Sequence, residues 1–207
     1  MPKQTFFNLP KEKQSTFIEI ALREFANNDY NTASISKIVE NAGIAKGSLY
    51  QYFADKQDLF LYLVDVSNQT LLEFVTTTQP SVQPEDFFET LRLQMSATVQ
   101  ASVKYPVHSQ LLRRAYTAPL PFHDEILDNA RKIRKGHFQA MLAQAQASGQ
   151  LDPKLDADIA SFMVQGMLAE LGPFLQSRLG QPETWSETEF NIVFDQVMTI
   201  LKKGLQK

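Results

Sequence analysis

A short stretch near the N-terminus carries side chains that could bind a nucleic acid. Their donors and acceptors reach phosphate oxygens and base edges, and the residues are Lys46, Ser48, Tyr50, Gln51 and Tyr52. Gly47 lies among them and would let a duplex approach the backbone closely. A phosphate is also favoured near Ala45 and Lys46 if a helix begins there, because unpaired N–H groups and the helix dipole attract an anion. The chemistry these groups suit is the binding of double-stranded DNA.

Two short helices joined by a tight turn would position these groups. The first helix has an apolar stripe with the spacing i, i+3, i+4, formed by Ile35, Ile38 and Val39. Gly43 follows, where a glycine can take the left-handed conformation that ends a helix. The second helix turns Leu49 and Phe53 inward. Such a helix-turn-helix places its second helix in the major groove, although spacing alone leaves open a helix pair with a purely structural role.

The charge of this region excludes a general basic surface. In residues 1–60 seven basic groups balance seven acidic ones: Lys3, Lys11, Lys13, Arg23, Lys37, Lys46 and Lys56 against Glu12, Glu19, Glu24, Asp29, Glu40, Asp55 and Asp58. The whole chain carries a net charge of −3. A non-specific nucleic-acid binder would instead be basic. We therefore expect local contacts: Lys56 on a phosphate, and Thr32, Ser34 and Lys37 on the DNA backbone.

The spacing of these residues resembles a known family. Residues 34–59 carry Ala42-Gly43-Ile44, Lys46-Gly47-Ser48-Leu49-Tyr50, Tyr52-Phe53 and Lys56, and this segment resembles the N-terminal domain of the TetR/AcrR family of transcriptional regulators. Residues 13–30 resemble the first helix of that family. Ala45 departs from the pattern, since the family often has Ser or Thr there as a helix cap. Loss of that cap would cost about 1 kcal/mol.

Composition indicates a globular protein of the reducing cytoplasm. The chain has 207 residues, of which 43% are hydrophobic, and no cysteine. We expect no signal peptide, because Asn8 and Pro10 interrupt the apolar residues of the N-terminus. The longest apolar stretch, residues 160–175, contains Gln165, Glu170 and Pro173, and is too short for a membrane span of roughly 20 residues.

No motif for catalysis is present. His108, His123 and His137 are the only histidines, and none forms an i, i+4 pair with another ligand in a metal-binding pattern. Nucleophile elbows, phosphate-binding glycine loops and nucleotide fingerprints are absent as well. We therefore expect no enzyme activity, no metal and no cofactor.

Helical periodicity dominates the chain, which predicts an all-α fold. The expected helices cover residues 10–27, 34–41, 45–53, 56–77, 85–104, 106–116, 121–148, 156–179 and 187–206. Proline breaks the pattern at Pro80 and Pro84. We predict a three-helix DNA-binding domain over residues 1–55. The larger helical domain over residues 56–207 would bind a ligand and form the dimer, with residues 56–77 as a bridging helix.

The last two expected helices present broad apolar faces. The residues that we assign to a dimer interface are Phe162, Gly166, Ala169, Phe190, Val193, Phe194, Val197, Ile200 and Leu201. From periodicity alone these faces could equally form an intramolecular core. The family resemblance favours a dimer, since the last two helices of each subunit form a four-helix interface in that family. A two-fold dimer would set two reading helices about 34 Å apart and bind a palindrome.

The resemblance also implies a pocket for a small-molecule effector, whose identity the sequence does not give. The candidate lining residues are mostly aromatic residues and methionines, with one leucine and one glutamate. They are Phe88, Met95, Leu112, Tyr116, Phe138, Met141, Phe162, Met163, Met167 and Glu170. Aromatic and Met side chains at helical spacing are more often part of an ordinary core than of a ligand pocket. Glu170 lies in an apolar helix and should be paired, exposed or functional.

These observations together predict a ligand-responsive, homodimeric transcriptional repressor that binds a palindromic operator. Effector binding would shift the bridging helix, and the distance between the two reading helices would then no longer match the half-site spacing of the operator. The alternative is a helical ligand-binding or protein-interaction module with a purely structural helix-turn-helix.

Overall fold

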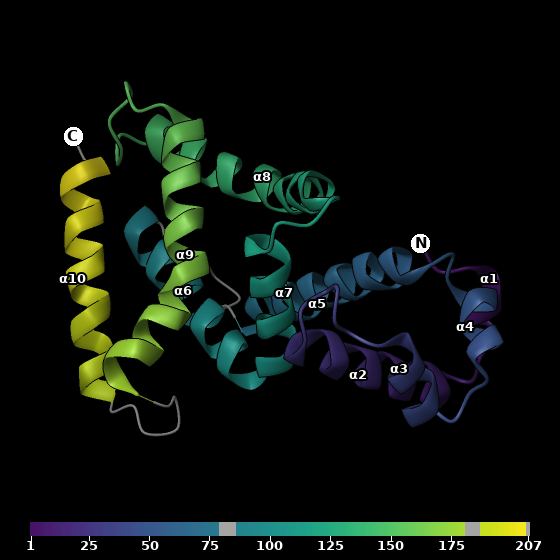
Figure 1. Ribbon diagram of the computed structural model, residues 1–207. Helices are drawn as coiled ribbons and strands as arrows, with labels where there is room; N and C mark the ends of the chain where they lie inside the picture. The colour runs from purple at the N-terminus through teal and green to yellow at the C-terminus, as the bar shows by residue number, and fades with distance from the viewer. Residues whose placement is uncertain (79–85, 181–186, 206–207) are drawn as a thin grey trace. The chain divides into compact units, whose positions relative to one another are not determined.

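The computed structural model describes residues 1–78, 86–180 and 187–205, and within these ranges it leaves the side chains of residues 130–138, 169 and 187 undescribed. Every regular element is a helix, and no strand occurs in these ranges (Figure 1). The helices are α1 (Gln4–Phe7), α2 (Lys11–Asn27), α3 (Ile35–Asn41), α4 (Lys46–Tyr52), α5 (Lys56–Thr78), α6 (Phe87–Lys104), α7 (Pro106–Thr117), α8 (His123–Ala147), α9 (Ala157–Leu179) and α10 (Glu187–Leu205). The predicted all-α fold is confirmed.

The chain folds into two compact units that are not contiguous in sequence. Unit 1 comprises residues 1–73 and 105–130, and unit 2 comprises residues 74–104 and 131–207. Unit 1 thus contains α7 and the start of α8 in addition to the N-terminal helices. The sequence-based division at residue 55 concerns function, and it stays a prediction.

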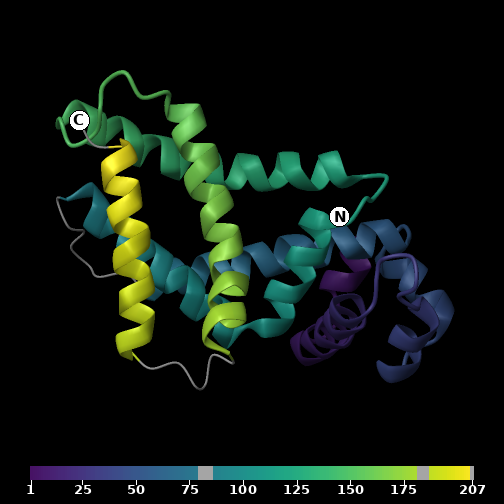
Figure 2. The same ribbon diagram turned by 60° about the vertical axis from the view of Figure 1, so that its left-hand side comes forward.

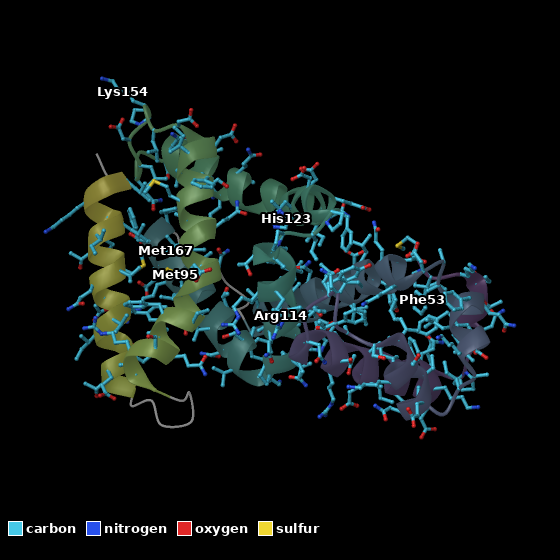
Figure 3. All side chains as sticks on the ribbon, in the orientation of Figure 1. Phe53, Met95, Arg114, His123, Lys154 and Met167 are labelled. Carbon is cyan, nitrogen blue, oxygen red and sulfur yellow. The ribbon has the colours of Figure 1, made fainter. Side chains whose placement is uncertain are left out.

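Unit 1 has a core rich in aromatic rings. Helices α2, α3, α4, α5 and α7 each contribute buried apolar residues to it. The ring of Phe53 lies 5.1 Å from that of Phe6 and 5.9 Å from that of Phe17. Figure 3 marks Phe53 among the side chains of the N-terminal helices. Leu49 is fully buried in the same cluster, as its inward position in the sequence predicts.

Helix α7 is fixed to the C-terminal end of α2 by an arginine. The Nε of Arg114 donates to the carbonyl oxygen of Ala26 at 2.8 Å, and its Nη1 forms an ion pair with Asp29. The last carbonyls of a helix have no intrahelical partner, and the cation also suits the negative end of the helix dipole. Leu111 and Leu112 bury the apolar side of α7 in the core of unit 1.

Unit 2 is built around α6, α9 and α10. Helices α9 and α10 run antiparallel and side by side in both views (Figures 1 and 2). Helix α9 continues through Pro173 to Leu179. A Cβ atom at Gly172 would lie 3.2 Å from the Oγ of Ser102, so glycine permits the close approach of α9 to α6.

The sequence predicted nine of these helices, each within about two residues of its observed ends. It missed α1, which has only four residues. This short helix lies against α4 (Figure 1).

Candidate nucleic-acid interface

Helices α3 and α4 form the predicted helix-turn-helix. The Oγ of Ser34 caps α3 by accepting from the N–H of Lys37 at 3.3 Å. The N–H of Ser34 in turn donates to Glu24 on α2 at 2.8 Å, which ties the start of α3 to the core. Gly43 has φ +64°, the left-handed conformation predicted for the turn. Ala45 provides no side-chain cap for α4, as expected from its side chain.

Most of the predicted contact residues lie on the outer face of this motif. Tyr50 is 48% exposed although its side chain is large and mostly apolar. Lys37, Ala45, Lys46, Gly47 and Gln51 are also exposed, while Ser34 and Ser48 are partly buried. A Cβ atom at Gly47 would meet no heavy atom within 4 Å, so packing within the chain does not require a glycine there.

Lys56 begins α5, as the sequence predicts, and its ammonium binds carbonyl oxygens of the same chain, while the predicted phosphate contact stays a prediction. Its Nζ donates to the carbonyl oxygen of Ala33 at 2.7 Å and to that of Asn31 at 3.3 Å. The same nitrogen lies 4.9 Å from the ring centre of Tyr30. Burial lowers the pKa of Lys56, and the carboxylate of Glu24 opposes this shift. Lys56 thus holds the loop before α3 onto the start of α5, and a phosphate contact would compete with these bonds.

Tyr52 also points partly inward. Its ring centre lies 5.9 Å from that of Phe6, and the side chain packs on the core of unit 1. Phe6 is fully buried and comes from the N-terminal segment, for which the sequence analysis predicts no helix and no contact with α4. The apolar pair Phe6-Phe7 ahead of Pro10 is the feature of the sequence that could have indicated a buried contact from the N-terminal segment.

Comparisons with known proteins match both parts of the chain. Residues 17–63 match the profile described as bacterial regulatory proteins of the tetR family, and residues 85–206 match the tetracyclin repressor-like C-terminal domain. The chain belongs to the TetR family. A TetR-family regulator from Chloroflexus aurantiacus J-10-FL has a solved structure with 37% identity and a TM-score of 0.78, and the match covers 100% of this chain and 99% of that one.

Two further matches concern fatty acid regulators. The fatty acid metabolism regulator protein of Bacillus subtilis is 25% identical over 170 residues, which are 77% of this chain and 81% of that protein. The transcriptional regulator FadR of Bacillus subtilis, solved in complex with stearoyl-CoA, is 20% identical with a TM-score of 0.69, over 92% of this chain and 98% of that one. At this identity the solved structure shows a shared fold only. Members of the TetR family are transcriptional regulators, and this chain is a regulator and not an enzyme.

The candidate effector residues of this TetR-family protein do not form one group. Phe88 and Met95 are buried in the core of unit 2, and Met141 and Met167 pack against it. Figure 3 shows Met95 and Met167 close to α9 and α10. Leu112 is buried in the core of unit 1, and Tyr116 packs against that core. The remaining candidates are exposed, namely Phe162, Met163 and Glu170, except for Phe138, which lies outside the described side chains.

The candidate dimer residues also divide into two sets. Val193 and Phe194 are buried in the core of unit 2, and Phe190, Val197 and Leu201 pack against that core. Phe162 and Gly166 on α9 and Ile200 on α10 are exposed, and Ala169 lies outside the described side chains. Ile159, Met163 and Ile192 are also exposed, although the residues assigned to the dimer interface do not include them.

We also searched the described part of the chain for metal sites, surface pockets and membrane spans. No group of three or more possible metal ligands occurs there. An open depression of about 360 Å³ lies along one face of α10, lined by Asp195, Gln196, Thr199 and Ile200. Among the described helices, none combines the length and the apolar character needed to cross a bilayer.

Proposed function

We propose that this TetR-family regulator is a homodimeric repressor that binds a palindromic operator and releases it when a small-molecule effector binds. The observation that carries the proposal is the exposed outer face of α4, where the large side chain of Tyr50 is 48% exposed. An aromatic side chain with a hydroxyl suits both base edges and phosphates. Lys46, Gln51 and Lys37 add donors around it.

An exposed apolar surface supports the homodimer. Phe162 is 78% exposed and Ile200 is 71% exposed within a single chain. On α9 the exposed residues Ile159, Phe162, Met163 and Gly166 recur at helical spacing and so share one face. A contiguous apolar surface of this kind marks an interaction site. A two-fold axis through it would pair α9 and α10 with their copies.

Dimerisation would also raise the affinity for DNA, which a reading domain without net charge cannot obtain from general attraction to phosphate. A single domain of this charge gains little from general attraction to phosphate. Two reading helices about one turn of DNA apart bind two half-sites at once. The dimer therefore binds the operator more tightly than one domain binds a half-site. The palindrome would then follow from the symmetry of the dimer.

The effector acts, in this proposal, on the C-terminal part of the chain. The methionines Met95, Met141 and Met167 and the ring of Phe88 share one core in unit 2, and methionine repacks readily around a guest. Helix α5 is continuous from Lys56 to Thr78 and carries residues of both units. A shift of this helix would move the reading helices, and DNA would weaken effector binding by the same factor.

The names of two matched proteins suggest where to begin with effectors. One is a fatty acid metabolism regulator and the other was solved with stearoyl-CoA. We propose a long-chain acyl compound as the effector class. Thermal unfolding with and without palmitoyl-CoA or stearoyl-CoA tests this: a ligand at a hundred times its Kd should add about 2.7 kcal/mol to stability. Coenzyme A alone is the control, and equal effects of all three compounds would contradict an acyl-specific site.

DNA binding is tested by selection from random duplexes at moderate salt. The purified protein should recover a palindrome, and the duplex should shift as a complex with one dimer. A Tyr50→Ala variant should fold and dimerise normally yet bind this duplex at least tenfold more weakly, since a base contact contributes about 1–3 kcal/mol. Leu72→Ala is a matched control, because Leu72 is also exposed, on α5. Recovery of no palindrome would favour the alternative, a helical ligand-binding or protein-interaction module.

A further inference from the structure

The end of the reading helix α4 is held by residues from the N-terminus of the chain. The backbone N–H of Lys3 donates to the carbonyl oxygen of Tyr52 at 2.7 Å, and the Lys3 Nζ donates to that of Tyr50 at 2.7 Å. The Oγ1 of Thr5 donates to the carbonyl oxygen of Gln51. Three successive carbonyls of the last turn thus receive a partner from outside the helix.

Helix α4 has particular need of such partners. It has seven residues, and isolated helices shorter than about 12 residues are marginal in water. Its first turn lacks a side-chain cap because residue 45 is alanine. The four last carbonyls of any helix have no intrahelical donor. The ammonium of Lys3 also lies at the negative end of the helix dipole, where a cation is stabilising.

The segment that provides these donors is itself anchored to the core. The ring of Phe6 is fully buried, 5.8 Å from that of Tyr62 on α5. The side-chain amide of Gln14 is buried and donates to the carbonyl oxygens of Leu9 at 2.7 Å and Phe7 at 3.2 Å. Because both ends of the contact are fixed, the segment can hold α4 in one orientation.

We infer that residues 3–9, here termed the N-terminal strap, position the reading helix for its half-site, with Lys3 and Thr5 as positioning residues. The strap lies outside residues 17–63, the part of the chain that matches the N-terminal family profile. The inference rests on the proposed DNA binding. Tyr50 is the most exposed aromatic residue of α4, and its own carbonyl is one of the three that the strap holds.

Substitutions that remove only the side-chain donors test the strap without emptying the core. Thr5→Val keeps the shape of the side chain, and Lys3→Met keeps the aliphatic stem. Lys13→Met on α2 is the control for the lost charge, because Lys13 is exposed and lies outside residues 3–9. The measurements are amide hydrogen exchange of the free protein, the oligomeric state, and affinity for the selected palindrome and for a random duplex at several salt concentrations.

The double variant should remain folded and dimeric. Amides of residues 49–53 should exchange about tenfold faster than in the wild type, since each hydrogen bond contributes modestly to the stability of the helix end. Palindrome affinity should fall about tenfold, random-duplex affinity should change less than twofold, and the salt slope should match that of wild type.

Three results would overturn the inference. Unchanged exchange in residues 49–53 would mean that the strap does not hold α4. An equal loss of affinity for the palindrome and for the random duplex would mean that the strap does not position α4 for its half-site. The logarithm of the binding constant falls linearly with the logarithm of the salt concentration. If the magnitude of this slope decreases by about 0.9 for the Lys3 of each subunit, Lys3 contacts a phosphate directly instead. If wild type selects no palindrome, the proposed function fails, and hydrogen exchange still decides whether the strap holds α4.

Discussion

Replacing Gly47 by alanine should stabilise the free protein and weaken its binding to DNA. Gly47 is the second residue of α4, and an added Cβ would meet no heavy atom within 4 Å. Alanine is favoured over glycine within a helix by about 0.5–1 kcal/mol, and we expect the lower value in the first turn. For a protein of this length, the melting temperature should rise by about 1–2 °C.

The effect on DNA binding has the opposite sign. If the start of α4 approaches the duplex, a Cβ at residue 47 would push the backbone away from a phosphate. A hydrogen bond to a charged group contributes about 1.5 kcal/mol or more. Two half-sites in a dimer would lose about 3 kcal/mol, and this corresponds to an affinity about a hundredfold weaker.

The assay is fluorescence anisotropy with the selected palindrome at fixed salt, alongside thermal unfolding of the same samples. Gly204→Ala on α10 is the matched control, because a Cβ there also meets no heavy atom within 4 Å. This control should gain stability and bind the palindrome as wild type does. Gly47→Ala binding within twofold of wild type would refute a close approach of the α4 backbone to DNA.

Three further substitutions test other parts of the fold. Phe162→Glu places a charge on the exposed apolar face of α9 and should yield folded monomers in sedimentation velocity, so a variant that stays dimeric would place the interface elsewhere. Gly43→Ala forces a side chain into φ +64° and should cost about 1–2 kcal/mol in denaturant unfolding, whereas unchanged stability would contradict the strain. Burial lowers the pKa of His108 below its ordinary 6.5, so the unfolded state takes up the proton first and stability falls as pH drops below about 6.5. His108→Asn keeps an N–H near the Oγ of Ser67 and should flatten thermal stability between about pH 5 and 7, and an unchanged pH profile would assign the dependence to other groups.

The helix-turn-helix could be predicted from the sequence because its determinants are local. A glycine in the left-handed region, a serine cap at residue 34 and an inward Leu49 each depend on residues a few positions away. The position of Lys56 depends instead on two carbonyls more than twenty residues earlier. A lysine at the start of a helix suggests a phosphate contact, and the competing intramolecular bonds have no sequence signature.

The apolar faces of the last helices show a second limit. Periodicity identifies Val193, Phe194 and Ile200 as parts of one broad stripe on α10. The structure buries the first two within the chain and leaves Ile200 exposed. A stripe this wide has more than one neighbour, and only the fold decides which part of it each neighbour covers.

The separation of the effector candidates has a similar cause. Leu112 and Tyr116 follow the proline-rich break, so the sequence placed them with the C-terminal helices. Leu112 is instead buried in the core of unit 1, and Tyr116 packs against that core. The four-residue helix α1 was missed because one turn is too short to show a period.

The return of α7 to the N-terminal core bears on how regulators of this kind can be recombined. The chain passes between the two units at residues 73–74, 104–105 and 130–131. A graft cut at residue 55 would transfer the reading helices without Leu111 and Leu112, and would leave the carbonyl of Ala26 without Arg114. We therefore expect a transplantable DNA-reading module to be discontinuous, so that a working chimera carries residues 105–130 of the donor together with its N-terminus.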